Sequence, residues 1–319
     1  MNERESLMAR ALDVLERGNF EISEKCTAGF MCFDIFARRN VLLLLLKVLT
    51  NIDSLSEGHA REITNIGNML CASPLMMGAR TRNSKMEDGV VYERYSIPAV
   101  TVNTFEDIML EDALPGIFSA RGGYYVKIDG VLLKEIRSKR DISLGDVAEN
   151  IGVSRRSVHK YENEGKCMTL KTALRLEEFL DESLARPIDL FFIPKVCEFA
   201  GELGGEFERN VLNMLRELGF EVYPIKKAPF NALTKDEERV MITKLLRLRL
   251  GSGRIFENAR VLKSISDTVK AEAFFVMDAN TEFKKNIHGV PAVKKEELKK
   301  IDDSDELIDV LSSRKVKAS

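Results

Sequence analysis

The sequence predicts a multidomain α+β protein in which a central all-α domain lies between two related α/β domains. Three observations lead to this fold class. The first and last thirds share four ordered blocks of similar sequence, and the middle third changes to short helical periods. The third observation is the length of 319 residues, which at roughly 100–200 residues per domain indicates two or three domains.

The repeated blocks have nearly constant spacing along the chain. The paired segments are Phe20-Glu21 with Phe220-Glu221, Phe33-Asp34 with Phe230-Asn231, Ala60–Leu70 with Ala259–Val269, and Ile97–Val100 with Val290–Val293, at offsets of 200, 197, 199 and 193. Each copy is predicted to run helix, three strands, helix, two strands, helix, with a buried sheet covered by helices on both faces. Pro98 and Pro291 are each expected to start a strand, because proline lacks the N–H that a strand interior uses.

The middle third is predicted to be a small hairpin followed by four short helices. Turn signals at Pro115-Gly116 and Arg121-Gly122-Gly123 precede the two short strands of the hairpin, Ile117-Phe118 and Tyr124–Ile128, and Asp129-Gly130 ends it. The expected helices are 132–139, a second one capped by Ser143, Arg155–Asn163 capped by Ser154, and a fourth capped by Thr169. The predicted domains are 1–114 (first copy), 115–130 (hairpin and linker), 131–190 (helical domain), 191–310 (second copy) and 311–319 (tail).

The second and third of these helices are joined by a short turn at Gly152-Val153, which is the pattern of a helix-turn-helix motif. Ala148 is small enough for the two helices to cross closely. The run Ile142–Glu162, with Ser-Leu-Gly-Asp-Val-Ala before the turn and Val-Ser-Arg-Arg-Ser-Val after it, resembles the lambda-repressor/Cro-like (Xre) DNA-binding family. The resemblance covers about 132–180.

This resemblance implies that Arg155–Asn163 is the recognition helix that lies in the major groove of double-stranded DNA. The positions that face base edges match Arg155, Arg156 and Lys160, whose side chains can donate to guanine O6 and N7. The positions expected at DNA phosphates are Ser143, Ser154, Asn163 and Lys166. Arg137 and Glu162 match a pair in which a first-helix arginine meets a recognition-helix glutamate and positions that helix.

Charge is distributed unevenly along the chain. The whole chain has 48 Lys and Arg against 50 Asp and Glu, so it is not a polycation. The segment 134–175 alone has ten basic against six acidic residues, a local surplus that favours a salt-dependent nucleic-acid surface.

The whole chain is similar to archaeal HTH-type transcriptional regulators of about this length. The Gly-Gly-Tyr-Tyr-Val-Lys-Ile-Asp-Gly segment at 122–130, followed by the helix-turn-helix, carries that similarity. It implies a non-enzymatic regulator that binds double-stranded DNA as a homodimer, with flanking domains for dimerisation or sensing. No catalytic residue, cofactor, metal site or small-molecule effector is identified.

An alternative is a nuclease of the PD-(D/E)xK type, because the flanking copies resemble the restriction-endonuclease fold. That chemistry needs two carboxylates to hold Mg²⁺ and a lysine near the attacking water. In the first copy Asp34 and Lys47 fit the pattern, but Leu45 occupies the position of the second carboxylate. In the second copy Asn231 and Ile242 replace both acids, and only Lys244 remains. A regulator is therefore the favoured prediction.

The cysteines and hydropathy indicate a cytoplasmic protein. The five cysteines (Cys26, Cys32, Cys71, Cys167 and Cys197) are scattered without CxxC spacing, so reduced thiols are expected. The longest apolar run, Val41–Leu46, is far shorter than the roughly 20 residues of a membrane helix.

Overall fold

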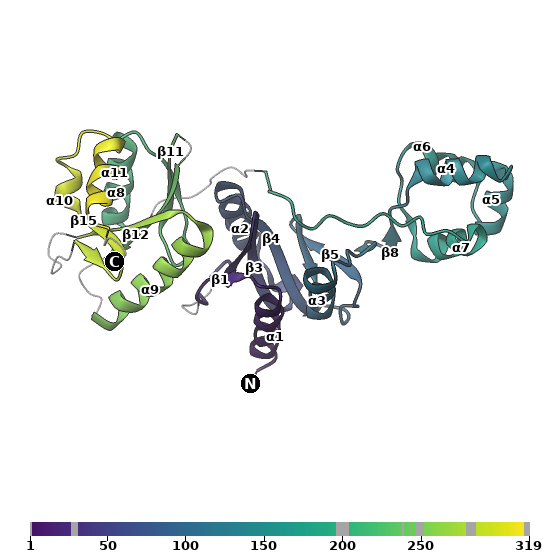
Figure 1. Cartoon of the computed structure of the whole chain (residues 1–319), viewed down its shortest axis with the longest axis horizontal. Coiled ribbons are helices and arrows are strands. Elements are labelled where there is room, and N and C mark those ends of the chain that lie inside the picture. Colours follow the sequence, from purple (N-terminus) through teal and green to yellow (C-terminus); the bar gives the residue numbers. More distant parts are fainter. Residues whose placement is uncertain are drawn as a thin grey trace. The chain divides into compact units, whose positions relative to one another are not determined.

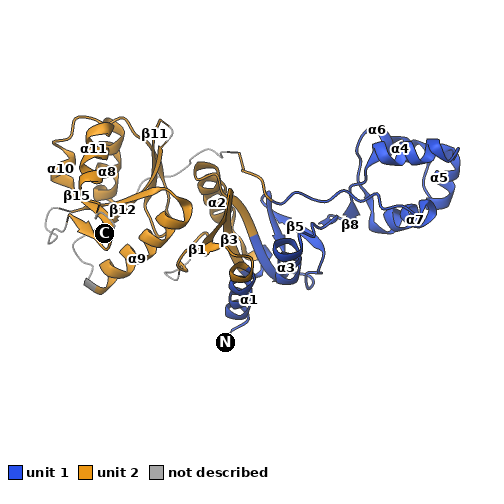
Figure 2. Cartoon of the chain, in the orientation of Figure 1, with its two compact units in different colours: residues 1–14, 49–53, 76–190 blue, residues 15–48, 54–75, 191–319 orange. Residues whose placement is uncertain are grey.

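The computed structural model describes residues 2–26, 31–195, 204–237, 239–246, 252–278 and 285–315 (Figure 1). The chain divides into two compact units, which Figure 2 colours separately. Unit 1 comprises residues 1–14, 49–53 and 76–190, and unit 2 comprises 15–48, 54–75 and 191–319. Within the described residues, no helix is both long enough and apolar enough to span a bilayer. The described cysteines are free thiols, and Cys197 lies outside the described residues.

The first third of the chain is an α/β domain, as predicted. Its elements are α1 (Glu3–Arg17), β1 (Glu21–Ile22), β2 (Ile35–Arg39), β3 (Leu42–Asn51), a 3₁₀ turn (Ile52–Ser54), α2 (Glu57–Met69), β4 (Ser73–Arg80), β5 (Val90–Arg94), β6 (Ile97–Val100) and α3 (Val102–Glu111). Within the described residues, these strands belong to a nine-stranded sheet with the order β1-β2-β3-β4-β6-β5-β7-β8-β9.

The last third is a second α/β domain. Its elements are α8 (Glu206–Glu217), β10 (Glu221–Pro224), β11 (Ala232–Asp236), β12 (Arg239–Leu246), α9 (Ser252–Val269), β13 (Glu272–Met277), β14 (Asn286–Ile287), β15 (Val290–Lys294), α10 (Lys295–Leu298) and α11 (Ser304–Ser313). The described sheet has the order β10-β11-β12-β13-β15-β14. Val211 and Leu215 of α8 and Leu307 of α11 are buried in one hydrophobic cluster. The domain therefore has a hydrophobic core of its own.

The two α/β domains have the same topology. The order β1-β2-β3-β4-β6-β5 of the first is repeated as β10-β11-β12-β13-β15-β14 in the second. The strand registers repeat as well, since Ile35 pairs with Leu46 as Ala232 pairs with Thr243, both at an offset of 197. This agreement confirms the predicted fold class of two related α/β domains.

The later strands repeat with the same precision, because the parallel pair Met76–Ala99 has its counterpart in Phe275–Ala292. The antiparallel pair Glu93–Pro98 likewise corresponds to Asn286–Pro291. A register shift of one residue would turn every side chain of a strand to the opposite face. The offsets inferred from sequence therefore describe the pairing at the level of single residues.

Two details of the predicted copies need correction. Each copy contains one more strand than expected, because β5 and β14 each form an antiparallel pair beside the proline-containing strand. Pro98 and Pro291 are the second residues of β6 and β15 rather than the first. β14 is only two residues long, and neither added strand has enough alternation to be recognised from sequence.

The middle third contains the four helices of the all-α domain (Figure 1). Asp129, Ser143, Ser154 and Thr169 each cap one helix by accepting a hydrogen bond from a backbone N–H of its first turn. Gly152 ends the second helix with φ +72°, a left-handed conformation that glycine adopts without steric penalty. The helices are α4 (Gly130–Lys139), α5 (Leu144–Ile151), α6 (Arg155–Asn163) and α7 (Leu170–Leu180).

The hairpin before these helices belongs to the sheet and to the helical core. It consists of β7 (Ile117–Ala120) and β8 (Gly123–Val126), and a short β9 (Met168–Thr169) follows α6. β7 pairs in parallel with β5, and β8 pairs with β9. Val126 and Ile128 are buried in the same cluster as Leu133, Val147 and Val158 of the helices. Within unit 1, the hairpin thus joins the α/β sheet to the helical domain without an intervening linker.

Candidate nucleic-acid interface

The exposed side of α6 carries the basic residues that sequence analysis selected. Ser154 accepts a hydrogen bond from the N–H of Ser157 and fixes the start of the helix, and Val158 is buried against the other helices. Arg155 and Arg156 are exposed, whereas Lys160, one turn further along, is half-buried. The helix therefore presents two adjacent guanidinium groups and an ammonium group outside the hydrophobic core.

The guanidinium of Arg155 lies over the first turn of α5. A Cβ atom added to Gly145 would be 2.9 Å from its Nη2 atom, so the absence of a side chain at Gly145 leaves room for it. The Asp146 carboxylate accepts hydrogen bonds at the start of α5, and these bonds lower its pKa, with a smaller contribution from the Arg155 charge. In this structure Arg155 is therefore directed along the surface of the motif.

A nearly buried ion pair connects α4 with α6. Arg137 donates from Nε to Oε1 of Glu162 at 2.7 Å and from Nη2 to Oε2 at 3.2 Å. Its Nη1 also donates to the carbonyl oxygen of Ile142 at 3.1 Å, just before α5 begins. The hydrogen bonds with Glu162, together with its charge, raise the pKa of Arg137. One side chain thereby contacts α6 and the segment that leads into α5.

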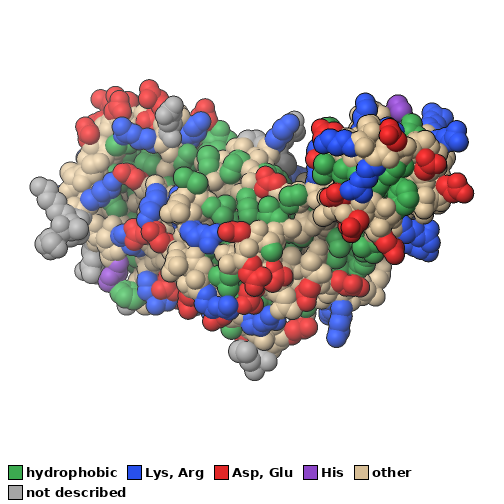
Figure 3. All heavy atoms as spheres, turned by 45° about the vertical axis from the view of Figure 1, so that its right-hand side comes forward, with side chains coloured by type: hydrophobic (Ala, Val, Ile, Leu, Met, Phe, Trp, Pro, Cys, Tyr) green, Lys and Arg blue, Asp and Glu red, His purple; other side chains and the backbone are tan. Residues whose placement is uncertain are grey.

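Three of the residues expected at phosphates are at helix ends, and the fourth, Lys166, is in the loop that follows α6. Ser143 and Asp146 form a reciprocal capping box at the start of α5, and the hydroxyl of Ser154 caps α6. The side-chain amide of Asn163 donates to the carbonyl oxygen of His159, and Lys166 is exposed, with Glu164 4.0 Å away. Figure 3 shows Lys and Arg side chains over the outer surface of the helical domain, interspersed with acidic ones.

The PD-(D/E)xK pattern of the first copy forms an internal ion pair. The ammonium of Lys47 lies 3.5 Å from Oδ1 of Asp34 and donates to the carbonyl oxygen of Met31 at 2.7 Å. Asp34 Oδ2 accepts from the N–H of Val48 at 2.7 Å. Both side chains are buried. The aspartate and the lysine that a metal-dependent nuclease would need therefore bind each other and the backbone.

The second copy keeps the backbone arrangement of this pattern without the ion pair. Asn231 accepts from the N–H of Leu245 at 3.0 Å, the equivalent of the bond from Val48 to Asp34. Its Nδ2 atom is 3.4 Å from Oε1 of Glu208. Lys244 is half-buried, and burial lowers its pKa while Glu208 raises it. Asn231 thus retains the structural role of the aspartate but contributes no charge.

Neither copy assembles a metal-binding cluster in the part of the chain that the structure describes. Leu45 and Ile242, at the position of the second carboxylate, are buried apolar side chains. Within the same residues, no group of three or more His, Cys, Asp or Glu side chains is placed to hold a metal ion. Each copy keeps the fold and the lysine of the nuclease pattern, but few carboxylate oxygens are available to bind Mg²⁺.

These features define a protein that combines a helix-turn-helix domain with a nuclease-like α/β domain, and comparisons with known families agree. Residues 4–115 match the PD-(D/E)XK superfamily domain, and residues 133–186 match the Helix-turn-helix family. The chain belongs to a family of archaeal HTH-type transcriptional regulatory proteins, which it matches over nearly its whole length.

Three relatives illustrate this membership, and each bears the name "Putative HTH-type transcriptional regulatory protein". The relative from Methanocaldococcus jannaschii is 38% identical over 97% of both chains, and that from Methanocella arvoryzae is 36% identical over 98% of both. The Pyrococcus horikoshii relative is 37% identical, covering 99% of this chain and 100% of its own. No solved structure matches the chain.

Two contacts that support the helix-turn-helix domain and its hairpin have no signal in the sequence. One is the pair Tyr92 and Tyr124, whose hydroxyl groups are 3.2 Å apart and connect β5 with the hairpin strand β8. The other is Gly130, where an added Cβ would be 2.3 Å from the carbonyl oxygen of Tyr161 in α6. The Asp-Gly dipeptide predicts the end of the hairpin, whereas in the structure Asp129 caps α4 and Gly130 is its first residue. Only the tertiary contact with α6 distinguishes the two interpretations.

Proposed function

We propose that this protein is a sequence-specific transcriptional regulator that binds double-stranded DNA through its helix-turn-helix domain. In this proposal it acts in the cytoplasm as a homodimer on near-palindromic sites, and the flanking α/β domains serve dimerisation or sensing. The observation that carries the proposal is the Ser-capped α6, whose first two residues, Arg155 and Arg156, are both exposed. Family membership supports the same function.

The proposed base contacts are Arg155, Arg156 and Lys160. Adjacent exposed guanidinium groups at the start of a helix are suited to guanine edges in the major groove. The proposed phosphate contacts are the cap residues Ser143 and Ser154, the last residue of α6, Asn163, and Lys166 in the following loop, because their side chains carry hydrogen-bond donors that suit phosphate oxygens. The pair of Arg137 and Glu162 is proposed to hold α6 in its docking orientation.

The test begins with selection of the preferred site from random duplex DNA by the full-length protein. Arg155→Ala and Arg156→Ala should each then weaken binding to that site by about 1–3 kcal/mol and relax its sequence preference. Lys139→Ala is the matched control, because Lys139 is an exposed cation on α4 whose neighbour Glu135 is 3.9 Å away. If both arginine variants kept the affinity and preference of the wild type, α6 would not be the reading element.

We propose further that the flanking domains do not catalyse a reaction. The nuclease alternative draws support from the PD-(D/E)XK match, yet Asp34 is paired with Lys47 and the second-carboxylate position is apolar in both copies. Domains at 1–114, 115–130, 131–190 and 191–310, with a tail at 311–319, remain the proposed division. In that division the hairpin 115–130 contributes to the core of the domain after it.

A further inference from the structure

Within unit 2, a small cavity lies beside Lys244 and is lined by residues of both α/β copies. Its volume is about 340 Å³, and Lys244, Arg254, Asn258 and Glu257 line it together with apolar surface from Met31 and Pro229. Pockets that hold small molecules are of this kind, with mostly apolar walls and a few polar groups that orient the ligand. The cavity therefore has the size and lining of a site for a compact metabolite.

Lys244 differs from its counterpart in the first copy. Lys47 has the carboxylate of Asp34 at 3.5 Å and the carbonyl oxygen of Met31 at 2.7 Å. In the second copy the aspartate is replaced by Asn231, whose Oδ1 is already bonded to the N–H of Leu245. Within the described residues, the ammonium of Lys244 has no hydrogen-bond or ion-pair partner, and Glu208 acts on it only through its more distant charge. A half-buried ammonium without an acceptor is unfavourable, because desolvation is not compensated.

The other polar groups around the cavity include both hydrogen-bond donors and a carboxylate, so they favour a ligand with a single anionic group. The exposed guanidinium of Arg254 and the amide of Asn258 add donors, whereas Glu257 adds one carboxylate. The thiol of Cys26, also on the wall, stays neutral because burial raises its pKa to about 12. One anionic group next to Lys244, with a compact apolar remainder against Met31 and Pro229, matches this lining.

We propose that this cavity binds a small organic anion through Lys244, with a carboxylate or phosphate group of the ligand accepting hydrogen bonds from the ammonium. Replacement of the catalytic-type aspartate by Asn231 would then have turned a degenerate nuclease centre into a ligand site. The inference goes beyond the proposed function, and it holds or fails whether or not α6 reads DNA.

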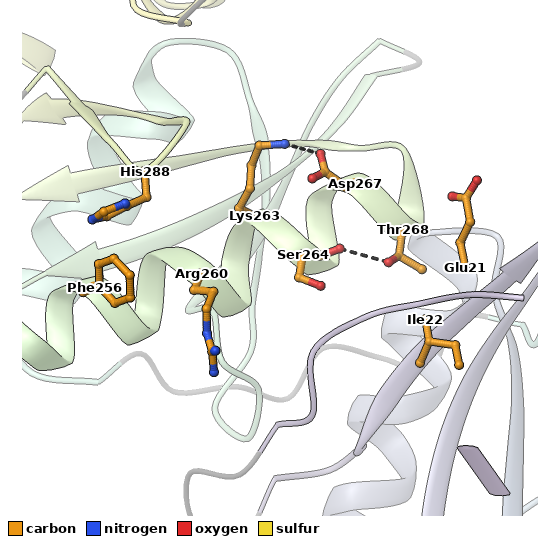
Figure 4. A pocket seen from close by; sticks show the side chains of 9 residues that line it. All are labelled: Glu21, Ile22, Phe256, Arg260, Lys263, Ser264, Asp267, Thr268 and His288. Carbon is orange, nitrogen blue, oxygen red and sulfur yellow. Dashed lines mark hydrogen bonds and ion pairs between the residues drawn. The ribbon is translucent and has the colours of Figure 1, made fainter. Parts of the chain in front are cut away.

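A larger cavity of about 430 Å³ in unit 2 does not offer the same opportunity (Figure 4). There Lys263 is paired with Asp267 on the same helix, and Arg260 lies 3.6 Å from Glu24. His288 packs with its ring edge against Phe256, at a centroid distance of 4.1 Å. Lys263 and Arg260 are already paired with carboxylates, so an anionic ligand in this cavity would have to compete with those ion pairs.

The experiment measures anion binding to the full-length protein without DNA. The protein is exchanged into a buffer free of phosphate and carboxylates, and inorganic phosphate and butyrate are titrated separately while the thermal midpoint and heats of binding are recorded. A ligand that binds only the native state raises the midpoint according to its concentration relative to Kd. At least one probe should bind the wild type, and Lys244→Met should weaken that binding at least tenfold.

Lys263→Met is the matched control, because it removes a lysine from α9 that is outside the cavity of Lys244. It should bind the probe as the wild type does. Arg254→Gln, an exposed substitution on the cavity wall, should weaken binding even if Lys244→Met fails to fold. Binding of inorganic phosphate indicates a phosphate-bearing ligand, and binding of butyrate indicates a carboxylate. Binding of neither probe to the wild type, or equal binding by Lys244→Met and the wild type, would overturn the proposal.

Discussion

Glu162, in α6, accepts two hydrogen bonds from the guanidinium of Arg137 in α4, the first helix of the helix-turn-helix domain. The glutamate side chain is only 2% exposed and the arginine 16% exposed, so little solvent screens the pair. Because Arg137 also binds the carbonyl oxygen of Ile142, the pair holds α6 against both α4 and the start of α5.

Removal of one partner should therefore destabilise the domain strongly. Arg137→Ala leaves the Glu162 carboxylate buried without its cation, and truncating a buried pair in this way costs about 3–5 kcal/mol. Chemical denaturation followed by circular dichroism would measure the effect. Lys139→Ala, which removes a surface cation near Glu135, should change stability by less than about 1 kcal/mol. Similar stabilities for the two variants would show that the pair is energetically unimportant.

Gly130→Ala should separate α4 from α6. An added Cβ would be 2.3 Å from the carbonyl oxygen of Tyr161 and 2.7 Å from that of Glu162, and backbone atoms cannot move aside easily. We expect a loss of about 1–3 kcal/mol in unfolding free energy, as for other overpacked sites. Gly58→Ala in α2 is the control, because no atom lies within 4 Å of its added Cβ. The thermal midpoint should fall for Gly130→Ala alone.

Asp129 should make the helical domain sensitive to acid. The N–H of Leu132 donates to its carboxylate and, together with Arg186, lowers its pKa in the folded state. A lowered pKa means that this stabilisation is complete above the unfolded-state pKa, near 4, and is lost as the pH falls through the folded-state value. The stability difference between wild type and Asp129→Asn should thus be constant near pH 6 and shrink below about pH 4. A difference that grew on acidification would contradict this assignment.

Lys166→Ala should weaken binding to specific and unrelated DNA alike, because a phosphate contact carries no base information. The slope of log K against log salt concentration should become less steep by about 1. Fluorescence anisotropy on both duplexes at several salt concentrations tests this, and a loss confined to the specific duplex would move Lys166 among the base-reading residues.

The purified protein should not cleave DNA in the presence of Mg²⁺ or Mn²⁺. Leu45 and Ile242 leave both copies without the second carboxylate, and Asp34 is bound by Lys47 and the N–H of Val48. Incubation of supercoiled plasmid with each metal, followed by electrophoresis, is sufficient. Metal-dependent cleavage that Asp34→Ala abolishes would establish the nuclease alternative instead.

The helix-turn-helix domain could be predicted closely from sequence because its signals are local. The sequence predicts Ser143, Ser154 and Thr169 as caps, and each accepts a hydrogen bond from a backbone N–H of the turn that follows it. It also predicts the turn at Gly152, and the φ of +72° at this residue explains why glycine stands there. Cap signals of this kind depend on three or four neighbouring residues and can therefore be found in the sequence itself.

Some features that depend on distant contacts could not be predicted. The pairing of β5 with β7 depends on backbone hydrogen bonds between segments around Val91 and Phe118, for which neither segment carries a sequence signal. The sequence shows that Asn231 removes the carboxylate partner of Lys244, but it does not show that, within the described residues, the ammonium also lacks a carbonyl acceptor like the one that Met31 provides for Lys47. The repeat itself was detectable, since four offsets recur in order and constrain one another.

The hairpin that joins sheet and helical domain sets the limits of a portable DNA-binding fragment. A fragment that began at residue 131 would lack Val126 and Ile128 from its core and would leave β9 without its partner strand. Starting at Ile117 restores both, but it uncovers the edge of β7 that β5 occupies in the full chain. An uncovered strand edge promotes association with other chains. A soluble fragment for engineered fusions therefore begins at Ile117 and carries a lysine on the freed side of β7.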